Sequence, residues 1–446
     1  MQRRSVALTT EIHNQLTSHL LRDDGQEDVC LATYSTSTGA ARTSQLLGSV
    51  ELPRDGDRTV HGNASFAGEY VLRVCSHAAR QGRGVAILHS HPSGRGWQGL
   101  SGFDHDAECS YADLVKRMTG LSLVGMTLAG RDHVWSARTW DKAEPVWSES
   151  VRVVGPRLTV HWNDDLLPVP QPRSSQGRTI SAWGEAMQAT LARLRVLVAG
   201  VGSVGLDVAN RLAATGIRHV AVMDYDVIEP VNLDRMIGAT RRDARLRRPK
   251  VDVAARLMRT ASTAANPVIA ALDTSICSPA GLAAALDFDV IFSCVDRPWP
   301  RAILNKMAYA DLIPVIDGGI GIDTFADGRM RSASWRSHTI VPGLPCLACS
   351  QQLSQQEVTL EMEGLLDDPG YIRRAGRENN RGSANVAALS ASVSAAQLTQ
   401  FISLVVAPSG HGVPGPLRYI LAPHVLEHMP HHTQRALRFR STTGAG

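Results

Sequence analysis

Short apolar runs alternate with amphipathic segments over the first 150 residues. The runs have the length and β-branched content of strands, and the segments between them carry apolar residues at helical spacing. The predicted strands are 29–34, 45–52, 84–91, 121–129 and 133–138, and the predicted helices are 11–21, 64–80 and 104–118. This pattern predicts a small α/β domain over residues 1–150.

From about residue 176 the pattern changes to strands that alternate regularly with helices. Such alternation is typical of a parallel sheet with crossover helices. The predicted strands are 196–199, 219–223, 267–272, 290–294 and 314–317, and a long amphipathic helix is expected at 390–406. Residues 151–175 begin with the strand-like VRVVGPRLTVHW and continue to LLPVPQPRSSQG, whose prolines and serines indicate a linker between the domains. We therefore predict an α/β protein with a second, mainly parallel domain over 176–446.

Composition adds limits to this picture. A chain of 446 residues is too long for one ordinary core, and 43% hydrophobic with 20% charged residues is typical of a globular protein. The net charge of +4 is small, and the basic run at 241–250 fits a solvated loop, so we predict no nucleic-acid partner. No stretch approaches the apolar length of a membrane span, so we also predict no membrane contact. The cysteine pattern, with a single close pair among seven, favours a reduced cytoplasmic protein.

The stretch VLVAGVGSVGLDVANRL combines an apolar strand, a glycine turn at Gly200, Gly202 and Gly205, and a helix. A second apolar run follows and ends on Asp224. Glycines let backbone amides approach phosphate groups, and the helix N-terminus adds a favourable partial charge. The unit predicts a nucleotide site, although by itself it fits an NAD-dependent dehydrogenase equally well.

The residues beyond the βαβ unit favour ATP over NAD. Asn232, Arg235 and Lys250 follow Asp224 and Asp226, in the sequences MDYD, NLDR and RPK. They would place an amide, a guanidinium and an ammonium group near the phosphates. Asp296, in CVD after the fourth strand, supplies a carboxylate that can hold Mg²⁺ against those phosphates. A dehydrogenase requires none of these groups.

This ordered set of motifs resembles the ThiF/MoeB adenylating family, which includes the ubiquitin-activating enzymes, over roughly residues 176–406. The resemblance implies a Rossmann-like domain in which Asp224 binds the ribose and Asp296 coordinates magnesium. Asn232, Arg235 and Lys250 would bind the phosphates. The implied reaction is attack by the C-terminal carboxylate of a carrier protein on the α-phosphate of ATP. The resemblance also implies a homodimer, in which Arg178 could reach across the interface.

A second set of chemical groups lies in VAILHSHPSGRGWQGLSGFDHDAE. Residues two apart on a strand face the same side, so His89 and His91 project together. Asp104 begins the following helix, three residues after Ser101. Two imidazoles and a carboxylate on rigid elements predict a three-ligand zinc site with an open fourth position. Ser101 and Asp104 could also be simply a helix-capping pair.

The pattern His-x-His followed by Ser-x-x-Asp resembles the JAMM motif of the JAB/MPN metalloproteases, over roughly residues 10–150. The resemblance implies that His89, His91 and Asp104 bind zinc and that Ser101 helps to stabilise the oxyanion. It also requires an upstream glutamate as general base. Glu27, just before a predicted strand, takes the family's position, and Glu51 and Glu69 are the other candidates.

The close pair Cys346 and Cys349 stands where adenylating relatives carry half of a structural zinc site. No cysteine follows Cys349, so the second half is absent. Three alternatives stay open: a lost site, a site completed by histidines of 423–432, or a transfer nucleophile.

The two resemblances together lead us to expect a two-headed enzyme for a ubiquitin-like or sulfur-carrier protein. One head would cleave an amide bond after the carrier's C-terminus, and the other would adenylate the exposed carboxylate, as in bacterial ubiquitin-like pathways. A separate conjugating enzyme would then be a partner. The alternatives are a sulfur-carrier activator for cofactor biosynthesis, a peptide-modifying ligase, and a scaffold with one inactive head.

Overall fold

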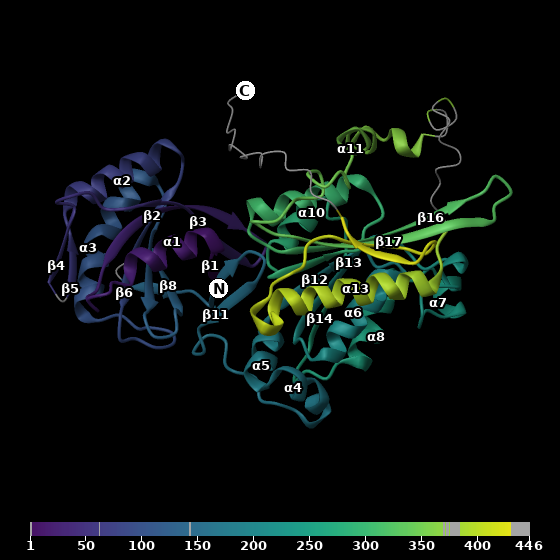
Figure 1. The fold of residues 1–446 in the computed structure, drawn as a ribbon, viewed down its shortest axis with the longest axis horizontal. Helices are drawn as coiled ribbons and strands as arrows, with labels where there is room; N and C mark the ends of the chain where they lie inside the picture. Colours follow the sequence, from purple (N-terminus) through teal and green to yellow (C-terminus); the bar gives the residue numbers. More distant parts are fainter. Residues whose placement is uncertain are drawn as a thin grey trace.

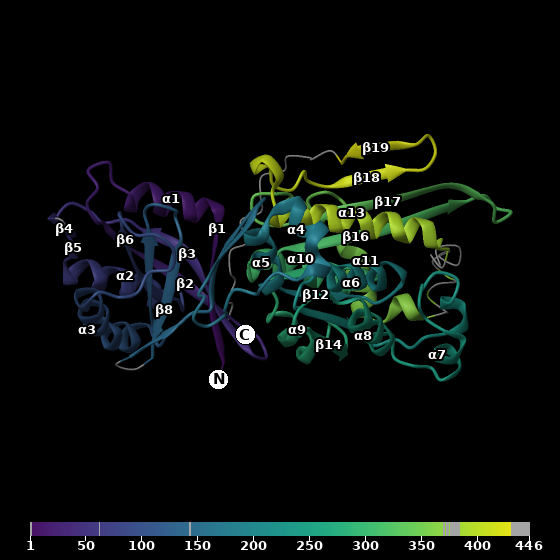
Figure 2. The same cartoon turned by 90° about the horizontal axis from the view of Figure 1, so that it is seen from below.

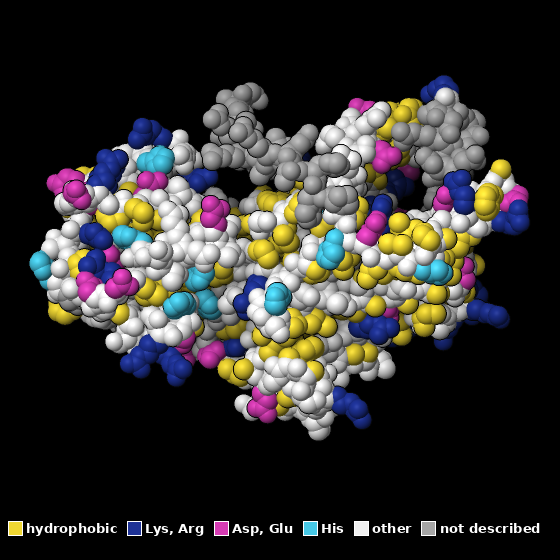
Figure 3. All heavy atoms as spheres, viewed as in Figure 1, with side chains coloured by type: hydrophobic (Ala, Val, Ile, Leu, Met, Phe, Trp, Pro, Cys, Tyr) yellow, Lys and Arg dark blue, Asp and Glu magenta, His cyan; other side chains and the backbone are white. Residues whose placement is uncertain are grey.

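The computed structural model describes residues 2–61, 63–141, 144–368, 371, 374 and 384–429. Within them the chain forms a nine-stranded sheet, an eight-stranded sheet and a small two-stranded hairpin. The two large sheets follow one another along the long axis of the molecule (Figure 1). Basic, acidic and apolar side chains are interspersed over the face shown in Figure 3.

The nine-stranded sheet has the order β11-β10-β1-β3-β2-β6-β7-β8-β9. Its strands are β1 (Arg3–Thr9), β2 (Val29–Thr38), β3 (Arg42–Glu51), β6 (Gly84–His91), β7 (Leu123–Ala129), β8 (Trp135–Trp140), β9 (Pro145–Trp147), β10 (Ser150–Val154) and β11 (Leu158–Trp162). Helix α1 (Thr10–Leu20) covers one face, and α2 (Gly68–Arg80) and α3 (Gly102–Thr119) cover the other. The strands alternate accordingly: Leu88 of β6 packs on the α1 side and Ile87 on the α2 side.

Two expectations for this half need correction. The strand-like residues at the start of the segment 151–175 do form strands, β10 and β11, but they belong to the first sheet and not to a linker, because β10 pairs in parallel with β1 and antiparallel with β11. The first domain therefore extends past residue 150, to Trp162. The helix expected at 64–80 begins only at Gly68, because residues before it form β5 (Asn63–Phe66), which pairs with β4 (Arg58–His61).

The eight-stranded sheet has the order β14-β13-β12-β15-β16-β17-β18-β19. Its strands are β12 (Arg195–Ala199), β13 (His219–Asp224), β14 (Val268–Asp273), β15 (Val290–Ser293), β16 (Val315–Thr324), β17 (Met330–Ile340), β18 (Leu417–Ile420) and β19 (Val425–His428). The first five in this order are parallel, as predicted. The last three are antiparallel and were not predicted; Figure 2 shows β18 and β19 extending the sheet beyond β17.

Helices cover both faces of this second sheet. Helices α5 (Glu185–Arg193), α6 (Ser203–Thr215), α8 (Lys250–Ala261) and α13 (Ala387–Val405) share one hydrophobic core, and α9 (Pro279–Ala285) and α10 (Pro298–Ala310) share the other. Further α-helices among the described residues of this domain are α4 (Gly177–Trp183), α7 (Arg241–Arg245) and α11 (Gln355–Met362). This is the doubly wound architecture expected from the sequence.

Helix α13 is long and apolar enough to cross a membrane by length and composition, in contrast to our expectation that no such stretch exists. Its contacts identify it as a core helix instead. Gln397 is fully buried and donates to the carbonyl oxygens of Ser293 and Ile316, and Gln400 donates to that of Gly415. Buried glutamines that satisfy backbone carbonyls, two of them in the sheet and one in the loop before β18, belong to a packed interior.

The two sheets share buried contacts. Val154, Leu158 and Trp162 of β10 and β11 belong to the same hydrophobic core as Leu194 and Val196 of the second domain. Such a continuous core couples the two domains more firmly than a flexible linker would.

Buried charges reinforce the same interface. Arg42, at the start of β3, pairs with Asp289, whose other carboxylate oxygen accepts from the backbone N–H of Arg195 at 2.9 Å. Arg152 lies 3.9 Å from the same carboxylate, and Arg195 also pairs with Glu149. Burial alone would raise the pKa of Asp289, but the three guanidinium groups lower it to about 2.

Replacing Asp289 with alanine is expected to destabilise the protein strongly, because Arg42 and Arg152 would remain buried without their anion. We expect the free energy of unfolding to fall by about 3–5 kcal/mol. Urea unfolding of the full chain measures this. Asp323→Ala, which removes an exposed ion pair with Arg331, is the control and should cost at most ~1 kcal/mol. Equal losses in both variants would contradict a structural role for the buried network.

Candidate active sites

The glycine loop lies where strand β12 ends and helix α6 begins. Gly200 has φ +88°, and a Cβ there would lie 2.5 Å from the carbonyl oxygen of Cys294, at the end of β15. A Cβ on Gly205 would clash with the carbonyl oxygen of Gly200. Only glycine fits both positions, so the loop stays close to the adjacent strand and leaves backbone amides at the α6 N-terminus open to a phosphate.

Asp224 holds this loop in place. Its carboxylate accepts hydrogen bonds from the backbone N–H of Val201 at 2.6 Å and of Asp226 at 2.8 Å. The loop and the end of β13 are therefore fixed to each other before any ligand arrives. This location, at the end of the second strand, is also the one a ribose-binding carboxylate takes in doubly wound nucleotide-binding domains.

The three groups predicted to bind phosphates have partners within the chain. Lys250, the first residue of α8, has its Nζ 2.7 Å from Oδ2 of Asp226. Arg235 donates to the carbonyl oxygen of Val231 at 2.6 Å and to Asp234 at 2.8 Å. The side-chain oxygen of Asn232 accepts from the backbone N–H of Glu229, as a cap of the short turn there. A phosphate would have to replace or join these partners.

Acidic groups at the ends of β13 and β15, the two strands that flank β12, act on Tyr225. Burial raises the pKa of Tyr225, and the negative charges of Asp226, Asp296 and Asp224 raise it further. Asp296, exposed just beyond β15, therefore lies near the end of β13, across the point where the crossovers diverge. The structure thus brings together Gly200, the β13 aspartates and Asp296, as the sequence predicts.

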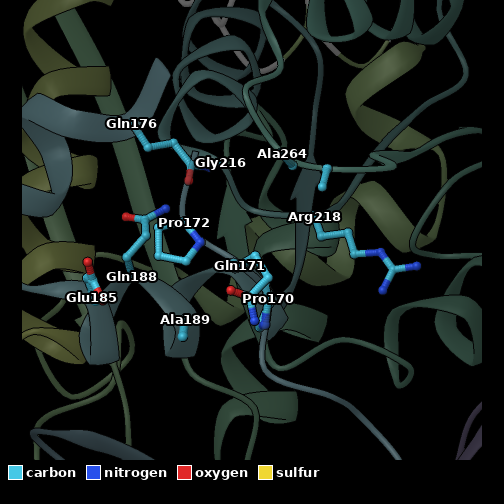
Figure 4. A pocket seen from close by; sticks show the side chains of 12 residues that line it. Pro170, Gln171, Pro172, Gln176, Glu185, Gln188, Ala189, Gly216, Arg218 and Ala264 are labelled. Atoms are coloured by element: carbon cyan, nitrogen blue, oxygen red, sulfur yellow. The ribbon is translucent and has the colours of Figure 1, made fainter. Parts of the chain in front are cut away.

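Arg178 lies away from these residues, on the short helix α4. Figure 4 shows a shallow pocket next to that helix, lined by Pro170, Pro172, Gln176, Gln188 and Gly216 among others. Gly216 caps the C-terminal end of α6, ~20 Å from the glycine loop for a helix of 13 residues. This pocket is therefore not the nucleotide site, and a single chain does not bring Arg178 to the glycine loop.

Among the described residues, no further metal ligand joins Cys346 and Cys349. The Sγ atoms of Cys346 and Cys349 are 2.9 Å apart, and burial raises the pKa of the Cys346 thiol. Over the described ranges, the group that could hold a metal ion is His89, His91 and Asp104. His424 and His428 are described and do not join the cysteines, whereas His431 and His432 lie outside the described residues.

The three predicted zinc ligands come together at the end of β6. Nε2 of His89 and Nε2 of His91 are 3.3 Å apart, and each lies 3.5 Å from a carboxylate oxygen of Asp104. A tetrahedral ion with bonds of about 2.0–2.1 Å requires its ligand atoms to be ~3.3–3.4 Å apart. The two histidines contact different oxygens of Asp104, and the donor set and these distances suit zinc.

Ser101 and Asp104 also form the capping pair considered as the alternative. Oγ of Ser101 lies 2.7 Å from Asp104, and the Asp104 backbone N–H donates back to Ser101 at 3.1 Å. This capping box begins α3 and at the same time aims the Asp104 carboxylate at the histidines. Nδ1 of His91 lies 3.1 Å from Oε1 of Gln98, which orients the ring. Gln98 was missed, because a loop glutamine has no distinctive spacing.

Glu27 is the glutamate nearest this cluster. Strand β2 pairs antiparallel with β6, Val29 opposite His89, so continuation of the register places Glu27 opposite His91. Burial raises the pKa of Glu27, and the charges of His91 and Asp104 also act on it. The other two candidates are elsewhere: Glu51 pairs with His77, and Glu69 is exposed on α2.

Comparison with known proteins identifies the family of the second domain. Residues 174–434, more than half of the chain, match the ThiF family model. The chain belongs to the ThiF family. The first domain, with the histidine cluster, precedes the matched region.

Among the relatives of this ThiF protein is the molybdopterin-synthase adenylyltransferase of Escherichia coli, 31% identical over 151 residues, which are 32% of this chain and 58% of that protein. The SAMP-activating enzyme E1 of Haloferax volcanii is 29% identical over 168 residues, 37% of this chain and 56% of that protein. The matches thus span just over half of these relatives. A solved structure of E. coli MccB with ATP aligns over 59% of this chain and 73% of that one, at 17% identity and a TM-score of 0.45.

Removal of one ligand is expected to abolish metal binding at the histidine cluster. Asp104→Ala should leave the purified protein with almost no zinc, whereas the intact chain should carry about one zinc per chain, because three ligands are needed to hold the ion. Elemental analysis after dialysis measures both. Asp106→Ala, two residues further along α3, is the matched control and should retain its zinc. Equal zinc in the two variants would rule out this cluster as the site.

Proposed function

We propose that the second domain adenylates the C-terminal carboxylate of a ubiquitin-like or sulfur-carrier protein. The observation that carries this proposal is the convergence of the glycine loop, Asp224, Lys250 and Asp296 at the switch point of a ThiF-family sheet. The relatives support it by name, since two of them are an adenylyltransferase and an activating enzyme.

Each residue in the proposed ATP site has a physical role. The loop amide at Gly202 and the α6 N-terminus bind phosphate oxygens, and Asp224 accepts from the ribose. Lys250 and Arg235 neutralise the charge that moves onto the departing pyrophosphate, and Asn232 adds a polar contact beside them. Asp296 would hold Mg²⁺, which supplies further neutralisation of the phosphates when bound. Catalysis then comes mainly from positioning and charge neutralisation.

Exchange of labelled pyrophosphate into ATP tests this proposal. In the presence of a carrier that ends in glycine, Asp296→Ala should lower the exchange rate at least ~100-fold, because the carboxylate proposed to hold Mg²⁺ against the phosphates is lost. Asp323→Ala, on the exposed β16–β17 hairpin, should exchange at the unmodified rate. If Asp296→Ala exchanged as fast as Asp323→Ala, the site would not be where we place it.

We further propose that the first domain is a zinc-dependent peptidase that acts at the C-terminus of the same carrier. The tetrahedral spacing of His89, His91 and Asp104, with Glu27 next to them, favours this second activity over a scaffold role. When bound, zinc would acidify a water and polarise the scissile carbonyl. Glu27 would take the proton of that water, and Ser101 would donate to the oxyanion.

The proposed sites lie at opposite ends of the molecule. Arg58 of β4 pairs with Asp28, beside Glu27, and Figure 1 shows β4 and α7 at opposite ends of the long axis. Strand β2 runs ten residues from Val29 to the interface, ~33 Å, and β12 runs five more to Gly200, ~16 Å. A carrier bound at one site therefore cannot present its tail to the other, and we propose that it is released between the two reactions.

A further inference from the structure

Two arginines share one buried carboxylate in the second sheet, beside the C-terminal end of β15. Asp317, in β16, is fully buried and accepts from Nε of Arg301 at 2.9 Å and from Nη1 of Arg336 at 2.5 Å. Oγ of Ser293 also donates to it at 2.7 Å. Burial by itself would raise the pKa of Asp317, but the two guanidinium groups outweigh burial and lower it. The cluster therefore carries one positive charge in excess.

This cluster adjoins the proposed catalytic aspartate. Asp317 pairs in register with Ser293, the last residue of β15, and Nη2 of Arg301 donates at 2.6 Å to the carbonyl oxygen of Val295. Val295 directly precedes Asp296. The side chains of Arg301 and Arg336 are 15% and 18% exposed, so both retain some access to solvent although their shared partner has none, and Arg336 also donates to Oε1 of Gln352.

Two glycines of β16 lie beside the cluster. Gly319 pairs with Arg336 across β16 and β17, and a Cβ on Gly319 would lie only 3.2 Å from Nε of Arg336. Gly318, the preceding residue, likewise has no room for a side chain, since a Cβ would lie 2.6 Å from Gln397. Gly318 and Gly319 therefore face opposite sides of the sheet, and it is Gly319 that leaves no side chain over Arg336 on the β16 side.

The adenylation reaction needs a cation in this location. The carboxylate of the carrier is negatively charged, and it must approach a triphosphate and Asp296, which are also negative. Arg235 and Lys250 lie with the β13 aspartates, on the ATP side of the site. The excess charge of Arg301 and Arg336, on the other side of Asp296, matches the charge of the second substrate, and guanidinium groups bind carboxylates through paired N–H donors.

We propose that Arg301 and Arg336, held by Asp317, form the subsite that binds the C-terminal carboxylate of the carrier and directs it at the α-phosphate of ATP. A carboxylate oxygen forms the new bond to the α-phosphorus, and the bond from that phosphorus to the bridging oxygen of the β-phosphate breaks. Pyrophosphate leaves with the electron pair, and no proton is transferred. This inference rests on the proposed adenylation and adds the binding site of its second substrate.

The experiment measures pyrophosphate exchange with the full chain, varying carrier and ATP separately. Arg301→Gln and Arg336→Gln should each raise the KM for the carrier about tenfold to hundredfold, the loss expected for a charge-assisted hydrogen bond, with the KM for ATP changed less than about twofold. Arg331→Gln, in the exposed hairpin of the same strands, is the matched control and should change neither constant.

A second probe tests charge recognition directly. A synthetic peptide that ends in Gly-Gly with a free carboxylate should compete with the carrier in the unmodified enzyme, and the same peptide with a C-terminal amide should compete at least about tenfold more weakly. In Arg301→Gln this difference should shrink to about twofold or less. If the arginine had a purely structural role, Arg301→Gln would lower the melting temperature and weaken the use of carrier and of ATP together. The free-acid peptide would then still compete better than the amide peptide by the same factor as in the unmodified enzyme.

The outcomes separate this inference from the proposed function. If the unmodified enzyme exchanges no pyrophosphate with any glycine-terminated carrier, the proposed adenylation is wrong. If it exchanges, but the arginine variants leave the KM for the carrier unchanged or raise the KM for ATP as much, the subsite is wrong and adenylation stands. Arg301→Lys keeps the positive charge but lacks the paired N–H donors, and it replaces Arg301→Gln if that variant unfolds. If Arg301→Lys kept both the KM for the carrier and the preference for the free-acid peptide, binding of the carboxylate by the paired donors of Arg301 would be wrong.

Discussion

The buried carboxylate of Asp289 ties three strands from both sheets at a single point. It pairs with Arg42 at the start of β3, accepts from the backbone at the start of β12, and itself directly precedes β15. Next to it, the tip of the β2–β3 hairpin donates from Ala41 to Asp287 at 3.0 Å. Because burial makes any unpaired charge here expensive, the two domains are held in one orientation.

That orientation determines where chemistry can take place. The interface occupies the N-terminal ends of β12 and β15, so their C-terminal ends, with the glycine loop and Asp296, face away from it. In the first domain the histidines end β6, next to the beginning of β2, at the far end from the hairpin that contacts the second domain. Both sites are built in the same manner, from a strand end and the beginning of a helix. Rigid elements of this kind hold reacting groups more accurately than loops do.

The parts predicted from sequence are those whose signals are local. Each of three motifs lies within a short stretch of sequence: His-x-His on a strand, the Ser101 capping box and the glycine loop. The structure assembles all three as expected. Strands β10 and β11 are also indicated locally, by the strand-like VRVVGPRLTVHW, but the sequence does not indicate which sheet they join. Their place in the sheet comes from the pairing of β10 with β1, which lies far earlier in the chain and is invisible in a local pattern.

Arg301 and Arg336 were missed for a related reason. Both are ordinary arginines in sequence, and only the fold brings them to Asp317 from a helix and a neighbouring strand. Conversely, the predicted phosphate ligands Arg235 and Lys250 are present at the site but engaged with Asp234 and Asp226. Residue type and order therefore predict which groups assemble, while their partners and their access to a ligand depend on packing.

The most direct test of the account uses a carrier precursor with extra residues after its terminal glycine. The unmodified enzyme should exchange pyrophosphate with both the precursor and the mature carrier, whereas His89→Ala should exchange only with the mature one. Adding Asp296→Ala enzyme, whose metal site is intact, to His89→Ala should restore exchange with the precursor, since the carrier is free between the two reactions. Exchange of the precursor by His89→Ala alone would contradict the claim that one head prepares the substrate of the other.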